Sequence, residues 1–207
     1  MVKPDKFLTN DDRQRVLDAV KDAESRTAGE IRVLVVGRST RHAWIPAIAL
    51  GAVAAGATYA VLNASAWGWA GSAEAIAAAS VGVAAAFLGW WLLPRGRGAK
   101  KRSVWSRAGR EFMSLGIRET AGATGVLLML SLWEREAVIL ADKAINEKVA
   151  PDTWSREVQI LIDGVKAGRP GEGIAAAVKE IGALLARHFP RGDDDVNELP
   201  DDVETRK

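Results

Sequence analysis

The sequence of 207 residues contains no cysteine. This excludes disulfide bonds, thiolate nucleophiles and cysteine-ligated zinc, and it leaves the redox compartment open. The N-terminal stretch MVKPDKFLTNDDRQRV contains no apolar core of the kind found in cleaved signal peptides, so we expect none. Lysine and arginine are absent from residues 43–93, a window whose single acid is Glu74. Charge is therefore missing from one continuous part of the chain and abundant in the rest.

The charge-poor window contains two apolar runs, residues 43–62 and residues 76–93. A helix of about 20 apolar residues spans the hydrocarbon core of a bilayer. Tryptophans stand at the predicted ends of both runs, where aromatic rings settle at the membrane–water interface: Trp44, Trp67, Trp69, Trp90 and Trp91. We therefore predict a transmembrane hairpin embedded in the lipid bilayer. The alternative is a pair of buried, alanine-rich helices in a soluble bundle.

Flanking charge favours the transmembrane interpretation and predicts its direction. Arg38 and Arg41 precede the first run, a basic block at residues 95–110 follows the second, and the connecting loop has no lysine or arginine. The positive-inside rule assigns both outer flanks to the cytoplasm. We expect a multi-pass protein of the inner (cytoplasmic) membrane with both termini cytoplasmic. The basic block is also expected to contact anionic lipid headgroups. Nucleic-acid binding is not expected, because no aromatic platform accompanies this charge.

The residues on either side of the hairpin show the periodicities of an α/β domain. Thr9 and Asp12 predict a capped helix start, and residues 31–36 predict a buried strand. Beyond the hairpin, the pattern predicts a helix with Val104, Trp105, Ala108, Phe112 and Leu115 on one face, strands at 124–132 and 137–141 joined by a turn at 133–136, and helices at 151–167 and 172–188. The acidic tail, residues 191–207, is predicted to be disordered.

Neither flank can bury its apolar strands alone, so the two flanks are expected to form one domain. We assign residues 1–41 to its first part, 42–94 to the transmembrane hairpin, 95–190 to its second part and 191–207 to the tail. The hairpin is thus an insertion into a single cytoplasmic α/β domain.

Three stretches resemble the TPM-domain family, in particular its bacterial branch in which two membrane segments interrupt the domain: FLTNDDRQRVLDAVKDAESRTAGEIRVLV, TGVLLMLSLWEREAVILADKAINEKVAPDTW and LLARHFPRGDDDVNELPD. The resemblance implies a three-layer α/β/α sandwich around a small mixed sheet. Members of the family are implicated in photosystem repair and receptor modulation, and some are reported as acid phosphatases or calcium binders. Where the family commonly has Asn-Gly before a strand, this chain has Thr124-Gly125.

Four carboxylates are candidates for a metal site: Glu30, Glu134, Glu136 and Asp142. All are predicted at strand ends or turns, where loops converge on ligands, and their hard oxygens suit Ca²⁺ or Mg²⁺. In the alternative interpretation, Glu30 and Asp142 cap turns, and Glu134 and Glu136 are solvated beside Arg135. No catalytic residue can be named. The glycines at 96–103 and 171–176 lack the context of phosphate-binding loops.

Two functions follow from these observations. In the first, a two-pass membrane protein presents a cytoplasmic TPM-like domain as an interaction or assembly module for an unknown protein partner. In the second, which depends on the resemblance alone, it is a membrane-tethered phosphatase that uses a divalent cation.

Overall fold

The computed structural model describes residues 4–39, 97–120, 122–150, 153–192, 197–200 and 202–206, together with the isolated positions 51, 53, 56 and 80. The chain divides into two compact units, Met1–Ser39 with Lys100–Lys207, and Thr40–Ala99. The predicted spans at 43–62 and 76–93 lie outside the described residues, apart from those four helical positions. Among the residues that are described, no helix is both long enough and apolar enough to cross a membrane.

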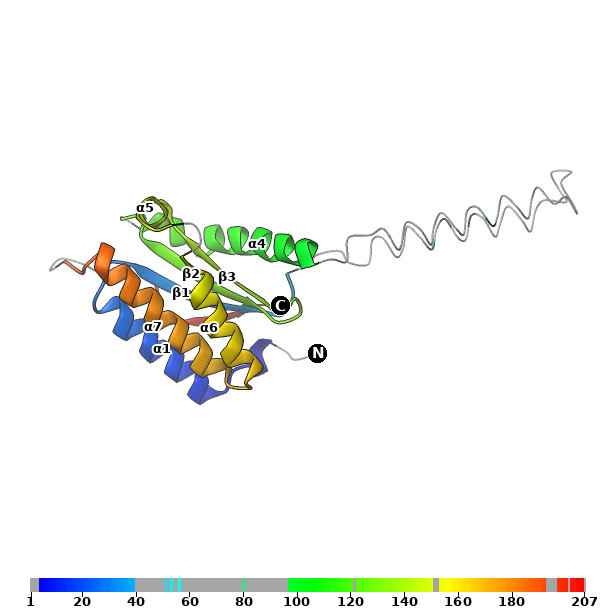
Figure 1. Ribbon diagram of the computed structural model, residues 1–207, viewed down its shortest axis with the longest axis horizontal. Helices are drawn as coiled ribbons and strands as arrows, with labels where there is room; N and C mark the ends of the chain where they lie inside the picture. Colours follow the sequence, from blue (N-terminus) through cyan, green and yellow to red (C-terminus); the bar gives the residue numbers. More distant parts are fainter. Residues whose placement is uncertain are drawn as a thin grey trace, which may run out of the picture. The chain divides into compact units, whose positions relative to one another are not determined.

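A four-stranded mixed sheet in the order β3-β2-β1-β4 forms the centre of the first unit (Figure 1). β1 (Glu30–Val36) pairs in parallel with all seven residues of β2 (Gly125–Ser131). β3 (Glu136–Ala141) runs antiparallel to β2, and β4 (Val203–Arg206) runs parallel to β1. Strands from both sides of the insertion therefore share one sheet, which confirms the expected α/β fold.

Three helices pack on one face of this sheet: α1 (Asn10–Glu24), α6 (Ser155–Lys166) and α7 (Pro170–His188). The predicted capping box at the start of α1 is present, because Thr9 and Asp12 each accept a hydrogen bond from the other's backbone amide. α7 begins close to its predicted start. α6 begins at Ser155, later than the periodicity suggested.

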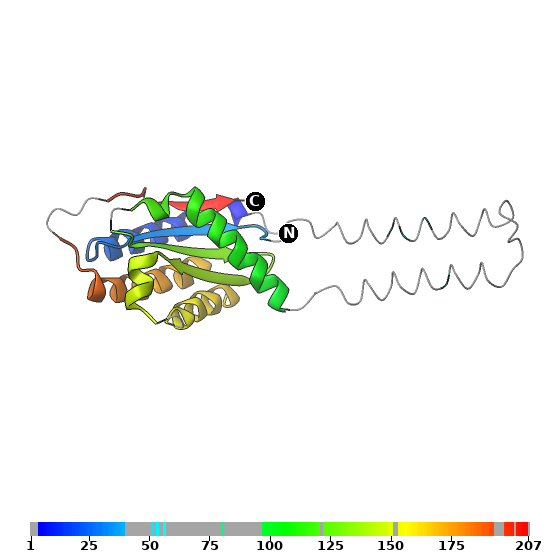
Figure 2. The ribbon, with the colours of Figure 1, turned by 90° about the horizontal axis from the view of Figure 1, so that it is seen from above.

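The opposite face of the sheet is covered by α4 (Arg97–Ser114) and the short turn η2 (Ile117–Glu119). Figure 2 shows α4 crossing the strands diagonally. Val104, Ala108 and Phe112, spaced four apart, pack against the sheet. Trp105 was expected on this inward face, but 45% of its surface is exposed. The prediction was wrong because Trp105 lies at the side of the stripe formed by those three residues.

Two short elements complete the described structure, η1 (Pro4–Lys6) near the N-terminus and α5 (Lys143–Lys148) directly after β3. Between β2 and β3 the chain turns at residues 132–135, one residue earlier than the predicted 133–136, and Arg135 adopts a left-handed conformation with φ 55°.

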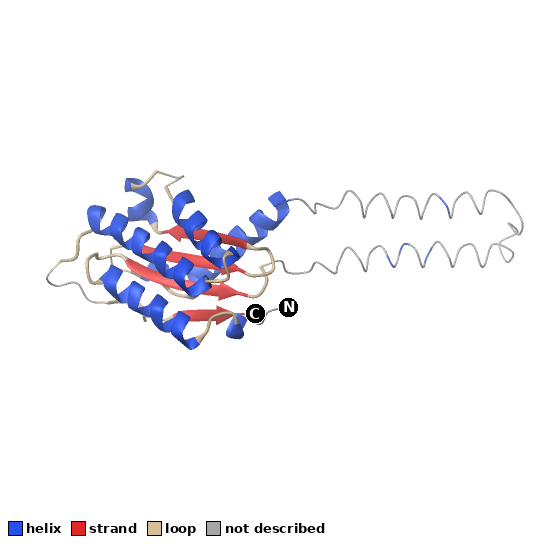
Figure 3. Ribbon diagram, turned by 60° about the horizontal axis from the view of Figure 1, so that its bottom comes forward, coloured by secondary structure: helices blue, strands red, loops and turns tan. Residues whose placement is uncertain are grey.

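The tail, predicted to be disordered, instead supplies the edge strand β4 (Figure 3). Val203 is 3% exposed and belongs to the main apolar core, and the amide of Gly37 donates to the carbonyl of Arg206 at 2.9 Å. Disorder was predicted for residues 191–207 because of the acids at 193–204. Residues 203–206 nevertheless alternate as strand residues do.

We expect deletion of residues 202–207 to lower the free energy of unfolding by roughly 1.5–3 kcal/mol, because the burial of Val203 is lost together with the cover on β1. Backbone amides of β1 and Gly37 should exchange hydrogen faster in this variant. Hydrogen exchange measured on the two variants and on the unaltered chain reports both effects. Deletion of Lys207 alone is the control, and equal protection in the two variants would contradict a structural role for the tail.

Close contact between α1 and α7 depends on a glycine. A Cβ added at Gly182 would lie 2.4 Å from the Cβ of Ala23. We expect Gly182→Ala to destabilise the protein by about 1–3 kcal/mol through overpacking. Gly109→Ala in α4 is the matched control, since a Cβ there meets no atom within 4 Å, and the higher helix propensity of alanine should raise stability slightly. Melting temperatures that shift in the same direction in both variants would refute this packing.

Candidate functional site

The four predicted metal ligands lie at two opposite ends of the sheet. Glu30 begins β1 and pairs with Gly125, and Asp142 directly follows β3, so both lie at the amino end of β1 and β2. Glu134 lies in the turn after β2, and Glu136 pairs with Ser131 at the carboxyl end. Seven strand residues at about 3.3 Å each separate the two pairs by roughly 20 Å. A single site built from all four carboxylates is therefore wrong.

Of these carboxylates, Glu134 has the most buried environment, with 4% of its surface exposed. Its Oε2 accepts hydrogen bonds from the Ser39 amide at 3.0 Å and from the Ser131 hydroxyl at 2.5 Å. The two serine hydroxyls are 2.8 Å apart. Glu134 thus holds the β2–β3 turn against the segment that follows β1. The expectation that Glu134 is solvated was wrong.

Structural contacts also account for the pair at the amino end. Oδ1 of Asp142 accepts from the Lys143 amide at 2.7 Å and caps α5, as the alternative interpretation proposed. Oε1 of Glu30 accepts from the Glu198 amide at 3.1 Å and so anchors the segment that leads to β4. Within the described ranges, no group of three or more histidine, aspartate or glutamate side chains is placed to hold a metal ion.

A chain of ion pairs crosses the sheet beneath α4. Arg107 Nε donates to Glu111 at 3.0 Å, and Glu111 also accepts from Arg206. Arg206 then contacts Glu204 at 2.7 Å, and Glu204 lies 3.6 Å from Arg32. These five residues join α4, β4 and β1. Glu111 and Arg32 are buried, at 8% and 5% exposed, whereas the side chains of Arg206 and Glu204 between them are 33% and 26% exposed.

The pKa of Arg206 is raised, mainly because its guanidinium donates a hydrogen bond to Glu204. Burial opposes this shift, and the negative charge of Glu111 adds to it. A cation with a raised pKa stabilises the fold fully below its unfolded-state pKa and loses that contribution only as the pH rises through the folded value. Arg206 therefore stays charged, and holds β4 to α4, throughout the physiological range.

Sequence reasoning missed this ion chain, although two signals were present. Glu111 is the single acid of α4, and Glu204 and Arg206 stand two residues apart, the spacing that places side chains on one face of a strand. The partners could not be named in advance, because Glu111 and Arg206 are 95 residues apart.

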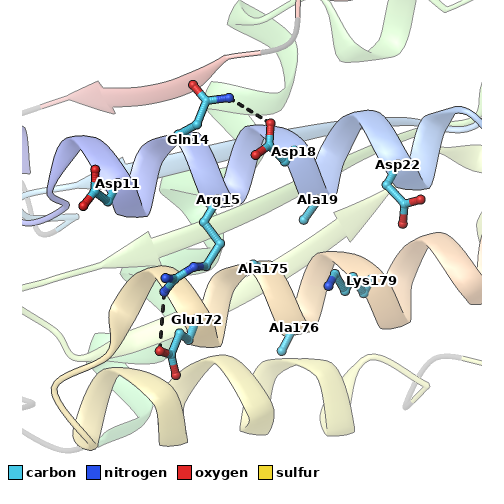
Figure 4. Close-up of a pocket in the computed structure, with 10 residues that line it drawn as sticks. All are labelled: Asp11, Gln14, Arg15, Asp18, Ala19, Asp22, Glu172, Ala175, Ala176 and Lys179. Atoms are coloured by element: carbon cyan, nitrogen blue, oxygen red, sulfur yellow. Dashed lines mark hydrogen bonds and ion pairs between the residues drawn. The ribbon is translucent and has the colours of Figure 1, made fainter.

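A shallow groove lies between α1 and α7 and encloses about 820 Å³ (Figure 4). Its lining residues are Asp11, Gln14, Arg15, Asp18, Ala19, Asp22, Glu172, Ala175, Ala176 and Lys179. Arg15 and Glu172 bridge it at 3.4 Å, and Gln14 donates to Asp18 at 2.8 Å. Every charged side chain of the lining is exposed to solvent, so burial activates none of them as an acid, base or nucleophile.

Comparison with known proteins supports the fold alone. No protein-family model matches this chain, and no curated protein matches it. The chain is similar to the NMR structure of the BA42 protein from the psychrophilic bacterium Bizionia argentinensis, with a TM-score of 0.64 and 23% sequence identity over 99% of each chain.

The carboxylates at the carboxyl end allow a matched test. We expect Glu134→Ala to lower the free energy of unfolding by about 1–3 kcal/mol, because the buried Ser39 amide loses its acceptor. Glu136→Ala, two residues further along and half-buried, should change stability by less than about 0.5 kcal/mol. Chemical denaturation of the two variants and of the unaltered chain distinguishes the two. Equal losses would show that Glu134 has no special role.

Proposed function

We propose that this chain is a two-pass membrane protein whose cytoplasmic α/β domain, TPM-like in its resemblance, acts as an interaction or assembly module. The observation that carries the proposal is where the insertion leaves and re-enters the domain. The chain exits after Ser39 at the carboxyl end of β1 and returns through α4. Arg107 of α4 donates to the carbonyl of Arg38 at 2.7 Å, so the exit and re-entry segments are in contact.

Contact between these segments suits a membrane hairpin, because a hairpin of two spanning helices leaves and enters the lipid on the same side. The proposed spans are residues 43–62 and 76–93, and the basic block at 95–110 is proposed to contact anionic headgroups. The groove between α1 and α7, open and rimmed by charges, is a surface suited to a protein partner.

The second function, a phosphatase dependent on a divalent cation, gains no support from the described geometry. It would need Glu30 and Asp142 to bind the metal without Glu134 and Glu136, which lie at the other end of the sheet. Both remaining carboxylates already accept backbone hydrogen bonds. We therefore retain the interaction module as the proposal.

The absence of cysteine gives a direct test of topology. In intact cells, a membrane-impermeant maleimide should label Ser72→Cys, in the proposed extracytoplasmic loop, and leave Ser155→Cys unlabelled. Ser155 is exposed at the start of α6, so lack of labelling there reports its compartment and not its burial. Both positions should react in broken cells.

Two other results would contradict the proposal. Labelling of Ser155→Cys alone in intact cells would place the α/β domain outside the cytoplasm. Failure of both positions to react until the cells are broken would show that residues 43–93 do not form a membrane hairpin.

A further inference from the structure

The outer face of α4 combines cations with large apolar side chains. Arg102 and Arg110 are exposed on it, two turns apart. Trp105 is 45% exposed and Met113 is 56% exposed. These four residues surround Ser106, which is also exposed. Together they form a surface that we call the α4 outer face.

Negative charge is missing from this face because the fold turns it inward. Glu111, the single acid of α4, is 8% exposed and pairs with Arg107 and Arg206 on the side facing the sheet. The ion chain thus has two effects. It holds β4 in place, and it leaves Arg102 and Arg110 without a neighbouring carboxylate on α4.

Few large apolar side chains of the α/β unit are exposed. Among the described residues of the α/β unit, the large hydrophobic side chains that are exposed are Trp105, Met113 and Trp133. Trp133 lies in the β2–β3 turn, and the guanidinium of Arg38 stacks 5.1 Å from the centre of its ring. The carbonyl of Arg38 also accepts a hydrogen bond from Arg107 of α4, so the turn that contains Trp133 lies near that helix.

This combination matches the chemistry of a phospholipid surface. Arginine pairs with phosphate through two parallel hydrogen bonds, and tryptophan settles at the level of the headgroups. A protein partner of opposite charge would satisfy the arginines but would give less reason for exposed aromatic rings beside them. α4 also begins at Arg97, directly after the second proposed span, so its first turns cannot be far from the lipid if that span forms.

We propose that the α4 outer face rests on an anionic phospholipid surface, with Arg102 and Arg110 on lipid phosphates and Trp105 and Met113 among the headgroups. This inference depends on the proposed membrane anchorage and deepens it, since it names the side chains that contact the lipid and fixes which side of the domain faces the bilayer. The α1–α7 groove, on the other side of the sheet, would then remain open to a protein partner.

The test uses the full-length protein in nanodiscs. A single cysteine replaces Ser106 and carries an environment-sensitive fluorophore, which is the only labelled site because the chain has no cysteine of its own. The discs contain either phosphatidylcholine alone or an equal mixture with phosphatidylglycerol, each with a lipid bearing a nitroxide quencher on its headgroup. Gln159→Cys, exposed on α6 across the sheet, is the reference position.

We expect strong quenching at Ser106 in anionic discs, weaker quenching in neutral discs, and little at Gln159 in either. Arg102→Gln with Arg110→Gln should lower the docking equilibrium constant roughly thirty-fold, because each cation near an anionic surface contributes about five-fold. Lys166→Gln with Arg187→Gln, exposed cations on α6 and α7, is the matched control and should change nothing. Unchanged melting temperatures would show that all variants fold.

The alternative outcomes separate the two proposals. If the protein inserts into discs but Ser106 is quenched as little as Gln159, or if both charge-removing pairs have equal effects, the docking proposal is wrong and the anchorage stands. If the protein does not enter the discs at all, the membrane anchorage itself fails, and the docking proposal fails with it.

Discussion

The parallel pairing of β1 with β2 is the interaction on which the rest of the domain depends. Its seven residue pairs join segments that precede and follow the insertion at residues 40–99. Both strands are buried along their whole length. A strand covered on both faces cannot be stable until its neighbours and its covering helices are present, so neither flank folds alone. The other elements, including α4 and the edge strand β4, pack against or pair with these two strands.

Closing the sheet across so long an insertion has an entropic cost that grows slowly with loop length, by about 0.6 kcal/mol for each doubling. If residues 43–93 form the proposed hairpin, its two ends lie close together, and the entropic cost of closing the sheet is then lower. The contact from Arg107 to the carbonyl of Arg38 at 2.7 Å is where the two ends meet in the domain. Buried Glu134 secures the same region through Ser39 and Ser131.

Local patterns predicted the elements well, and long-range contacts account for what they missed. The capping box at Thr9, the strand at 31–36 and the β2–β3 hairpin are local, so the sequence was sufficient for them. β4 has only four residues, and its partners Arg32 and Glu111 are far away in the sequence, so the short alternation at 203–206 was too weak a pattern to predict an ordered strand.

The four candidate metal ligands are divided between the two ends of the sheet for a reason that was partly visible in the sequence. A β-hairpin with Glu134 in its turn necessarily leaves Asp142, at the end of its second strand, far from that turn. What the sequence could not supply was the direction of β1, which decides whether Glu30 lies near Glu134 or near Asp142. Strand direction is set by the packing of the whole domain. It therefore places at opposite ends of the sheet carboxylates that had been grouped only because each was predicted at a strand end or turn.

The surface chemistry of α4 is also a product of the fold and not of composition. Some cations of the basic block face the sheet and others face solvent, a difference that the sequence does not reveal. Arg107 turns inward and is neutralised by Glu111, whereas Arg102 and Arg110 face solvent. Because the inward and outward sets do not share partners in the ion chain, stability and surface charge can be altered separately. The proposed membrane contact of the outer set could therefore be strengthened or weakened without loosening β4, which the inner set holds.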